Sequence, residues 1–304
     1  MSDVQARSPI GAAPTLPVMP AIEAASAERR APGLLRRLPS SRVAMVGLTL
    51  VLFWIAVALL APILPLPSPT AQDYASIRHP GPSALHWLGV DPLGRDTLAR
   101  VVWGARTVLA VAPAAVLAAY IVGCTVGLLA GYYRGWVDTF ISRASDVILS
   151  FPVVVLYVIL IANIGPSALN IIVAVVVASA PGISRIVRGL VISLMQHDFV
   201  AAAVLRRERP LYIMAVELLP NCRGPLITDF CLRLGYTTIT IGTLGFLGLG
   251  LPPPDPDWGG MVKQATSVIT VWPHMALLPC FALVSLVLGF NLLADGLTEL
   301  SLSD

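Results

Sequence analysis

The sequence has little charge. Only 12% of its 304 residues are Asp, Glu, Lys or Arg, whereas a soluble domain carries about a quarter. Hydrophobic residues make up 56% of the chain, and the mean hydropathy is +0.81. Several runs without Asp, Glu, Lys or Arg reach the roughly 20 apolar residues that cross a bilayer as a helix. The composition therefore excludes a soluble globular protein and predicts an integral membrane protein.

Lysine is almost absent. A phosphate-binding P-loop requires the lysine of the pattern GxxxxGK[ST], which contacts the nucleotide phosphates. The one lysine, Lys263, lies in GGMVKQ, which does not fit this pattern. We therefore expect no enzymatic activity and no catalytic residue in this chain, and any ATP hydrolysis would come from another polypeptide.

Metal-binding and nucleic-acid-binding patterns are also missing. The cysteines show no CxxC spacing, the histidines are scattered, and the basic residues do not cluster on one soluble face. These cysteines and histidines are Cys124, Cys222, Cys231, Cys280, His79, His86, His197 and His274. We expect the cysteines to be small apolar side chains in helices. We also expect the chain to bind no metal, no other cofactor and no nucleic acid.

The apolar runs predict an all-α membrane protein with six transmembrane helices. These are expected over residues 43–64, 107–131, 147–164, 167–186, 224–249 and 268–294. The uncharged run from 147 to 184 is too long for one crossing at about 1.5 Å per residue, and Gly165-Pro166 near its middle indicates a turn. Residues 1–40 are predicted to be a disordered tail, and residues 41–300 to be the membrane domain. Gly123, Gly127 and Gly131 recur every four residues, which favours close helix packing.

The basic residues predict the orientation of these helices. With the amino-terminal tail inside the cell, fourteen arginines fall in inner segments and five basic residues in outer segments. Because positive residues favour the cytoplasmic side, both termini are expected to be cytoplasmic. Residues 190–221 then form an inner loop, and the segments 65–106 and 252–264 lie outside.

The inner loop contains the stretch DFVAAAVLRRERPLYIMAVELLPN, residues 198–221. Three consecutive alanines favour a short helix, and Phe199 offers an aromatic anchor for a partner. Two interpretations remain open from the residues alone. The stretch is either an ordinary loop whose arginines set the topology, or a docking helix for a cytoplasmic partner.

This stretch resembles the coupling loop of ATP-binding-cassette (ABC) importer permeases, whose pattern is Glu-Ala-Ala, three residues, Gly, and later Leu-Pro. The matching positions are Ala202, Ala203, Ile213, Leu219, Pro220 and Asn221. Ala201 stands where the family usually has Glu, and Arg207 where it usually has Gly.

Other segments resemble the second permease subunit of dipeptide, oligopeptide and nickel importers in the same order. They are HWLGVDPLGRDTLARVVWGAR (86–106), GYYRGWVD (131–138), SDVILSFP (145–152), FLGLGLPPPDPDWGGM (246–261) and FNLLADGL (290–297). The resemblance covers about residues 40–300. It implies the type I importer fold and a location in the cell inner membrane.

The resemblance also implies partners and roles. The partners are a second homologous permease subunit, two cytoplasmic ATPases that hold ATP and Mg, and an extracytoplasmic binding protein that delivers substrate. The coupling residues are expected to be Phe199, Ala201, Ala202, Ala203, Arg206, Arg207 and Pro220, with Phe199, Ala202 and Ala203 forming the docked surface. Substrate would cross by alternating access.

Two further groups of charged residues are candidate sites. Asp91, Arg95 and Asp96 are expected to cap a short outer helix that runs to Arg106, or to form a lip toward the binding protein, and these roles are compatible. Asp229 and Arg233 lie four residues apart in the fifth predicted helix and can pair. Their pair is either structural or part of a gate or substrate path.

The sequence leaves the substrate open. Peptides, nickel chelates, opines and glutathione are all compatible with the resemblance. The rival classes are a self-sufficient secondary transporter or channel and a membrane scaffold without a transport role. Co-purification with two ATPases would separate both rivals from an importer permease.

Overall fold

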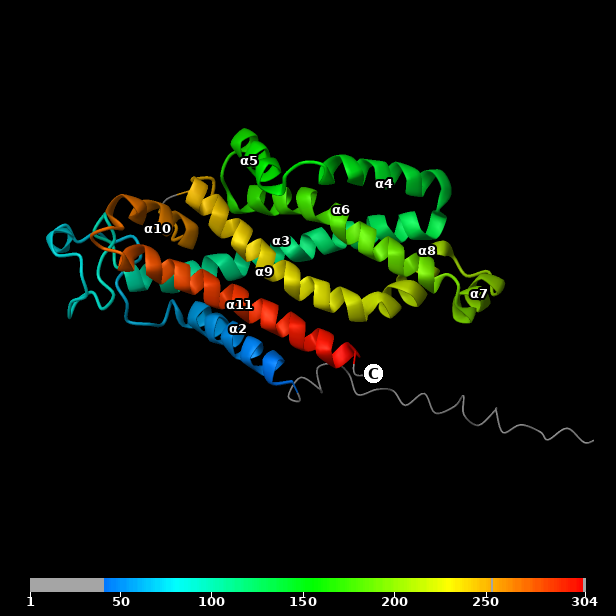
Figure 1. Cartoon of the computed structure of the whole chain (residues 1–304), viewed down its shortest axis with the longest axis horizontal. Coiled ribbons are helices and arrows are strands. Elements are labelled where there is room, and N and C mark those ends of the chain that lie inside the picture. Colours follow the sequence, from blue (N-terminus) through cyan, green and yellow to red (C-terminus); the bar gives the residue numbers. More distant parts are fainter. Residues whose placement is uncertain (1–40, 253, 303–304) are drawn as a thin grey trace, which may run out of the picture.

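The computed structural model describes residues 41–252 and 254–302 as an elongated bundle of helices (Figure 1). The tail predicted over residues 1–40 lies outside the described residues. The helices are α2 (Arg42–Leu60), α3 (Thr97–Tyr133), α4 (Gly135–Leu149), α5 (Val153–Ile164), α6 (Ala168–Leu194), α7 (Asp198–Leu205), α8 (Pro210–Tyr212), α9 (Arg223–Leu247), α10 (Trp258–Ala265) and α11 (His274–Leu302). A π-helix (Ile213–Leu218) and a 3₁₀ turn (Leu219–Cys222) join α8 to α9, and two more 3₁₀ turns cover Ser76–Arg78 and Thr266–Val268. The described part of the chain contains no strand beyond an isolated bridge between Val90 and Asp96.

The described helices include five that are long and apolar enough to cross a membrane, and up to six if a bent pair counts as one. The bent pair is α4 and α5, which meet at an angle of 88°. The helix predicted over 147–164 is therefore not continuous, because Pro152 has no N–H to continue α4 and the chain turns there. With 12 residues, α5 alone is about 18 Å long, short of the roughly 30 Å hydrocarbon core.

The second predicted helix begins earlier than expected. Thr97 starts α3, which has 37 residues and includes the segment that was predicted to be a separate outer helix ending at Arg106. Nothing between Thr97 and Thr107 interrupts the helix, since the only proline within α3 is Pro113. The segment predicted to lie outside and the segment predicted to cross the membrane are thus one helix.

The glycines at four-residue spacing pack α3 tightly against α6, as predicted. A β-carbon added to Gly123 would lie 2.6 Å from Ile183, and one added to Gly131 would lie 2.7 Å from Val191. At Gly127 the nearest atom would be the carbonyl oxygen of Ser184, also at 2.6 Å. These separations are too short for a side chain, so the interface depends on backbone approach.

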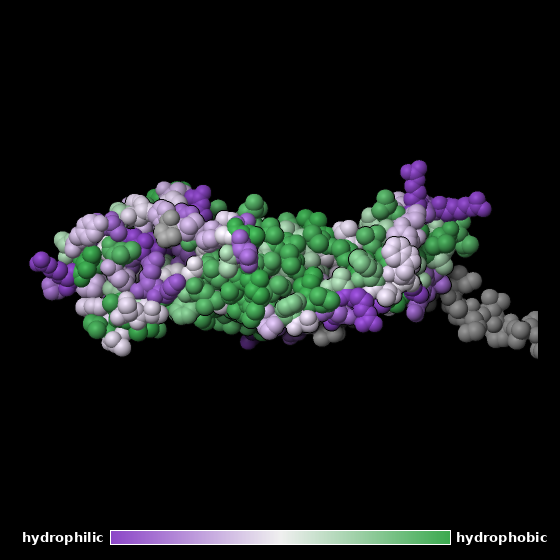
Figure 2. Space-filling view, turned by 90° about the horizontal axis from the view of Figure 1, so that it is seen from above, coloured by the Kyte–Doolittle hydropathy of each residue, from purple (hydrophilic) through white to green (hydrophobic). Residues whose placement is uncertain are grey.

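The bundle is apolar in its middle and polar at both ends (Figure 2). The α7–α8 segment lies at one end, together with the carboxyl end of α11, and α10 lies with the loops of residues 61–96 at the other end (Figure 1). The buried indole of Trp54 on α2 donates to Ser285 Oγ on α11 at 2.9 Å, which ties the first and last helices together. The two polar ends of the bundle are therefore connected by the same packed helices.

Candidate functional site

The first surface is the α7–α8 segment, which we call the elbow and define as residues 198–221. Val200 and Ala203 are buried in the main core of the chain, and Phe199 packs half-buried against that core. Ala201, Ala202, Val204 and Leu205 are exposed, and Leu205 has an exposed fraction of 84%. The elbow thus presents small and apolar side chains to the outside.

This geometry corrects the predicted docked surface. Ala203 has no exposed area, so its side chain cannot contact a partner, whereas Phe199 packs against the bundle core and keeps part of its side chain exposed. Ala202 remains available. The spacing of Phe199, Val200 and Ala203 places them on one helix face, and that face is the one that packs inward.

Arg207 has a left-handed backbone conformation with φ of 58°. It follows α7 in a helix-terminating motif in which Arg207 N–H donates to Val204 O at 2.9 Å and Glu208 N–H donates to Ala203 O at 3.2 Å. This pattern normally ends with glycine, because the left-handed conformation costs other residues free energy. The structure thus explains why a glycine is expected at this position and shows that arginine occupies it with backbone strain.

We expect Arg207→Gly to stabilise the elbow by about 0.5 kcal/mol. Relief of the left-handed conformation contributes about 1 kcal/mol, and the greater freedom of glycine in the unfolded chain offsets part of it. Arg206 has right-handed geometry with φ of −71°, so Arg206→Gly should lower stability instead. Hydrogen exchange of residues 198–208 measures both effects. Equal changes in the two variants would contradict the assignment of strain to Arg207.

The remaining elbow residues lie at its surface. Arg206 is 3.5 Å from Glu208 and 3.4 Å from Glu217, and its side chain is 54% exposed. Such exposed pairs contribute between about 0 and 1 kcal/mol, so a partner can displace them at small cost. Pro220 is exposed in the 3₁₀ turn that leads into α9.

The second surface lies at the opposite end, where α3 begins. Asp96 caps α3, since its carboxylate accepts from Ala99 N–H at 2.7 Å and also lies 2.8 Å from His86 Nδ1. Asp91 accepts from the Arg95 side chain at 2.7 Å. The predicted helix-capping role of this group is confirmed for Asp96, whereas Asp91 and Arg95 form a buried ion pair beside the cap.

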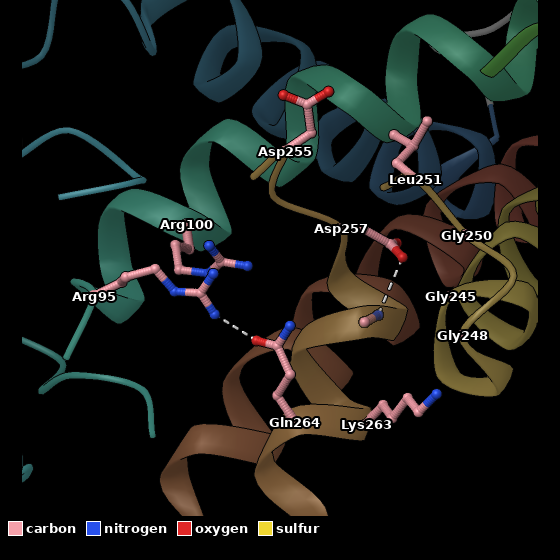
Figure 3. Close-up of a pocket in the computed structure, with 11 residues that line it drawn as sticks. Arg95, Arg100, Gly245, Gly248, Gly250, Leu251, Asp255, Asp257, Lys263 and Gln264 are labelled. Atoms are coloured by element: carbon pink, nitrogen blue, oxygen red, sulfur yellow. Dashed lines mark hydrogen bonds between the residues drawn. The ribbon is translucent and has the colours of Figure 1, made fainter. Parts of the chain in front are cut away.

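A pocket of about 300 Å³ opens beside this ion pair, between the start of α3, the end of α9 and α10 (Figure 3). Of the predicted residues only Arg95 lines it. Four lining residues were not predicted from the sequence, although two of them occupy recognisable positions. The four are Arg100, Asp257, Lys263 and Gln264. Arg100 lies four residues after the cap Asp96, and Asp257 precedes the helix start WGG in a proline-rich segment.

Asp257 is 5% exposed, and its carboxylate accepts from the N–H groups of Gly259 and Gly260, which caps α10. Burial raises the pKa of Asp257 to about 6, while these two hydrogen bonds and Arg100 act in the opposite direction. Since the folded-state pKa lies above the ordinary value of 3.8, the folded chain binds this proton more tightly than the unfolded chain.

The contribution of Asp257 to stability is therefore full below about pH 4 and is lost as the pH rises through 6. We expect Asp257→Asn, which can still cap α10, to remove this component. The measurement is the difference in thermal unfolding midpoint between the original chain and the variant from pH 4 to pH 7. A difference that stays constant over this range would refute the assignment.

The Asp229 and Arg233 side chains pair as predicted, with Arg233 Nε 2.6 Å from Asp229 Oδ2. Sequence reasoning did not identify their third partner, Tyr120 of α3, whose hydroxyl donates to the same carboxylate oxygen at 2.5 Å. Both members of the pair keep about a fifth of their side chains exposed. The cluster joins α3 to α9, and part of it remains exposed at the surface of the chain.

The fold, with an apolar middle and two polar ends, is that of a helical membrane protein with an accessible surface at each polar end. Residues 123–302 match the family described as binding-protein-dependent transport system inner membrane component, and residues 33–82 match the N-terminal transmembrane domain of oligopeptide transport permease C. The chain therefore belongs to the family of binding-protein-dependent transport system inner membrane components. This is a transport family and not an enzyme family, and its members are multi-pass inner membrane proteins.

Relatives with established names support this assignment. The chain is 39% identical to the dipeptide transport system permease protein DppC of Alkalihalophilus pseudofirmus over 87% of this chain and 86% of the relative. It is 39% identical to the glutathione transport system permease protein GsiD of Pectobacterium atrosepticum, over 87% and 88% of the two chains. For GsiD of Escherichia coli O157:H7 the identity is 36%, over 87% of both chains.

Proposed function

We propose that this chain is the permease subunit of an ATP-driven importer for short peptides or closely related small solutes. The observation that carries the proposal is the exposed elbow, which lies within the region that matches the family. The names of the relatives mention dipeptides and glutathione, which favours a peptide cargo over nickel.

The partners in this proposal are a second, homologous permease subunit, two cytoplasmic ATPases and an extracytoplasmic binding protein. The ATPases hold ATP and Mg, and the chain itself holds no cofactor. Both termini lie in the cytoplasm in this arrangement. The elbow then faces the ATPases, and the pocket beside α10 faces the binding protein.

The elbow couples ATP hydrolysis to the membrane helices in this mechanism. Ala201, Ala202 and Leu205 contact a groove of the ATPase, and Arg206 and Arg207 pair with its acidic side chains. Phe199 and Ala203 transmit the movement, because they are packed into the bundle core. Pro220 ends the elbow where it re-enters the bundle, and closure of the ATPases then reorients the helices around the path.

The Tyr120, Asp229 and Arg233 cluster has two roles open to it. It is either a structural connection between α3 and α9 or a gate that substrate contacts on the way through. The exchanged variant, Asp229→Arg with Arg233→Asp, keeps an ion pair in reversed order. Retained transport in this variant supports the structural role, and lost transport with normal assembly supports the gate.

The decisive experiment is purification of the tagged chain after co-expression with the proposed second permease, ATPase and binding-protein subunits. We expect two ATPases and one second permease to co-purify, and proteoliposomes of this complex to accumulate peptides only with ATP and the binding protein. Uptake that needs neither ATP nor the binding protein would refute the proposal and favour a secondary transporter.

A further inference from the structure

The pocket beside α10 is lined by several charged and polar side chains, and no proposed step uses it. Its 300 Å³ lie at the lower end of the range for small-molecule sites. Figure 3 shows Arg95 and Arg100 extending into it from one side, while Gln264 and Asp257 approach from α10. Asp255 and Lys263 at its rim are exposed, so the pocket is open to the outside.

One side of the pocket is rich in hydrogen-bond donors. Arg95 and Arg100 are 6% and 2% exposed, and each guanidinium carries five N–H donors. Their hydrogen bonds within the described residues go to Asp91, to Gln264 Oε1 at 2.6 Å and to Pro69 O at 3.3 Å. Several of the ten donors therefore have no hydrogen-bond partner among the described residues.

One carboxylate, Asp91, serves both guanidinium groups, and it contacts Arg95 at Nε and at Nη2. Asp91 Oδ2 bonds Arg95 and lies 3.4 Å from Arg100 Nε, a buried atom without a hydrogen-bond partner among the described residues. A buried donor without a partner costs about 1 to 3 kcal/mol. Arginine pairs bind a carboxylate with two parallel hydrogen bonds, which is the group that would complete this side.

The opposite side of the pocket suits a positive group. It contains Asp255, which is exposed, and Asp257, which is buried against α9. The carboxyl end of α9 also faces this side, and the carbonyl of Leu247 accepts a long bond of 3.4 Å from Lys263 Nζ. Carbonyls at the end of a helix carry partial negative charge, and the ammonium group of Lys263 already lies there, so Asp255 supplies the remaining exposed negative charge on this side.

We propose that this pocket binds a small zwitterion of the short-peptide class at the outer end of the protein. The carboxylate of the ligand binds Arg95 and Arg100, and its ammonium group lies toward Asp255. This assignment rests on the proposed function for the identity of the ligand class. It adds a receiving site on this chain, separate from the binding protein.

The test is direct binding of radiolabelled dialanine to the co-purified complex in nanodiscs, without binding protein, by equilibrium dialysis. We expect saturable binding, and binding at least ten-fold weaker for N-acetyl-dialanine and for dialanine amide, because each lacks one of the two charges. Gln264→Glu should also weaken dialanine binding at least ten-fold. Its carboxylate has nearly the shape of the amide and neutralises the Arg95 guanidinium that the ligand needs.

The matched control is Gln72→Glu, which makes the same charge change at an exposed position on the same end and keeps its hydrogen bond from Tyr74. It should leave dialanine binding unchanged, and the thermal midpoint of both variants should equal or exceed that of the original chain. Absence of saturable dialanine binding, or equal binding by Gln264→Glu, overturns the proposal. Uptake of a dipeptide mixture by the full importer is measured in parallel. If ATP-dependent uptake is intact but Gln264→Glu does not change dialanine binding, the proposal for the pocket alone is refuted. If uptake is absent, the importer function is refuted.

Discussion

Replacement of Gly127 by valine is expected to prevent accumulation of the folded protein. A β-carbon at this position would lie 2.6 Å from the Ser184 carbonyl oxygen and 2.7 Å from Val187, so α3 and α6 would have to move apart. Overpacking of this kind typically costs up to about 3 kcal/mol, and backbone atoms cannot rotate away as a flexible side chain can. The measurement is the yield of monodisperse protein and its thermal unfolding midpoint.

Gly189→Val is the control for this prediction. Gly189 lies on α6, is exposed, and has no atom within 4 Å of an added β-carbon. Both variants add the same branched side chain to a helix, so their difference isolates the contact between α3 and α6. Similar yields of the two variants would show that this contact does not determine assembly.

Reversal of the two elbow charges, Arg206→Glu with Arg207→Glu, is expected to lower substrate-stimulated ATPase activity about ten-fold. The proposed ion pairs to the ATPase would become repulsions, and a ten-fold effect corresponds to about 1.4 kcal/mol. Folding should be retained because Arg206 and Arg207 are exposed. The measurement is the ATPase rate of the reconstituted importer with and without substrate-loaded binding protein.

Arg143→Glu with Arg223→Glu provides the comparison for net charge. Both arginines are exposed and lie in segments predicted to face the same side as the elbow. This pair should leave coupling within about two-fold of the original rate, since exposed charges away from a contact are largely screened. Loss of coupling in both double variants would assign the effect to the electrostatics of the whole face, and not to the elbow.

The helical membrane fold could be predicted from the sequence because hydrophobic length is a direct physical requirement of the bilayer. Close packing of α3 against another helix could also be predicted, since glycines at four-residue spacing clear side chains from one helix face and let a second backbone approach it. That the partner is α6 could not be predicted from this spacing. The break between α4 and α5 was missed because the uncharged run continues through Pro152 without a change in hydropathy. Hydropathy shows which residues are compatible with the membrane interior, but it does not show where the chain changes direction.

The candidate sites were only partly visible in the sequence. The position of Arg207 was recognised from the glycine expected there, and its left-handed backbone gives the physical reason. The inward orientation of Phe199 and Ala203 depends on which face of α7 packs on the bundle, which a run of three alanines does not specify. The pocket joins Arg95 to Gln264, which are 169 residues apart, so only the folded chain brings them together.

The length of α3 has a mechanical consequence. At 37 residues it extends about 55 Å, nearly twice the hydrocarbon thickness, without a loop along its course. Its first turn carries Arg100 beside the outer pocket, and its last turns rest on α6 near the elbow. A tilt of this helix would displace both of its ends at once, so the proposed ligand pocket and the proposed ATPase contact would move together.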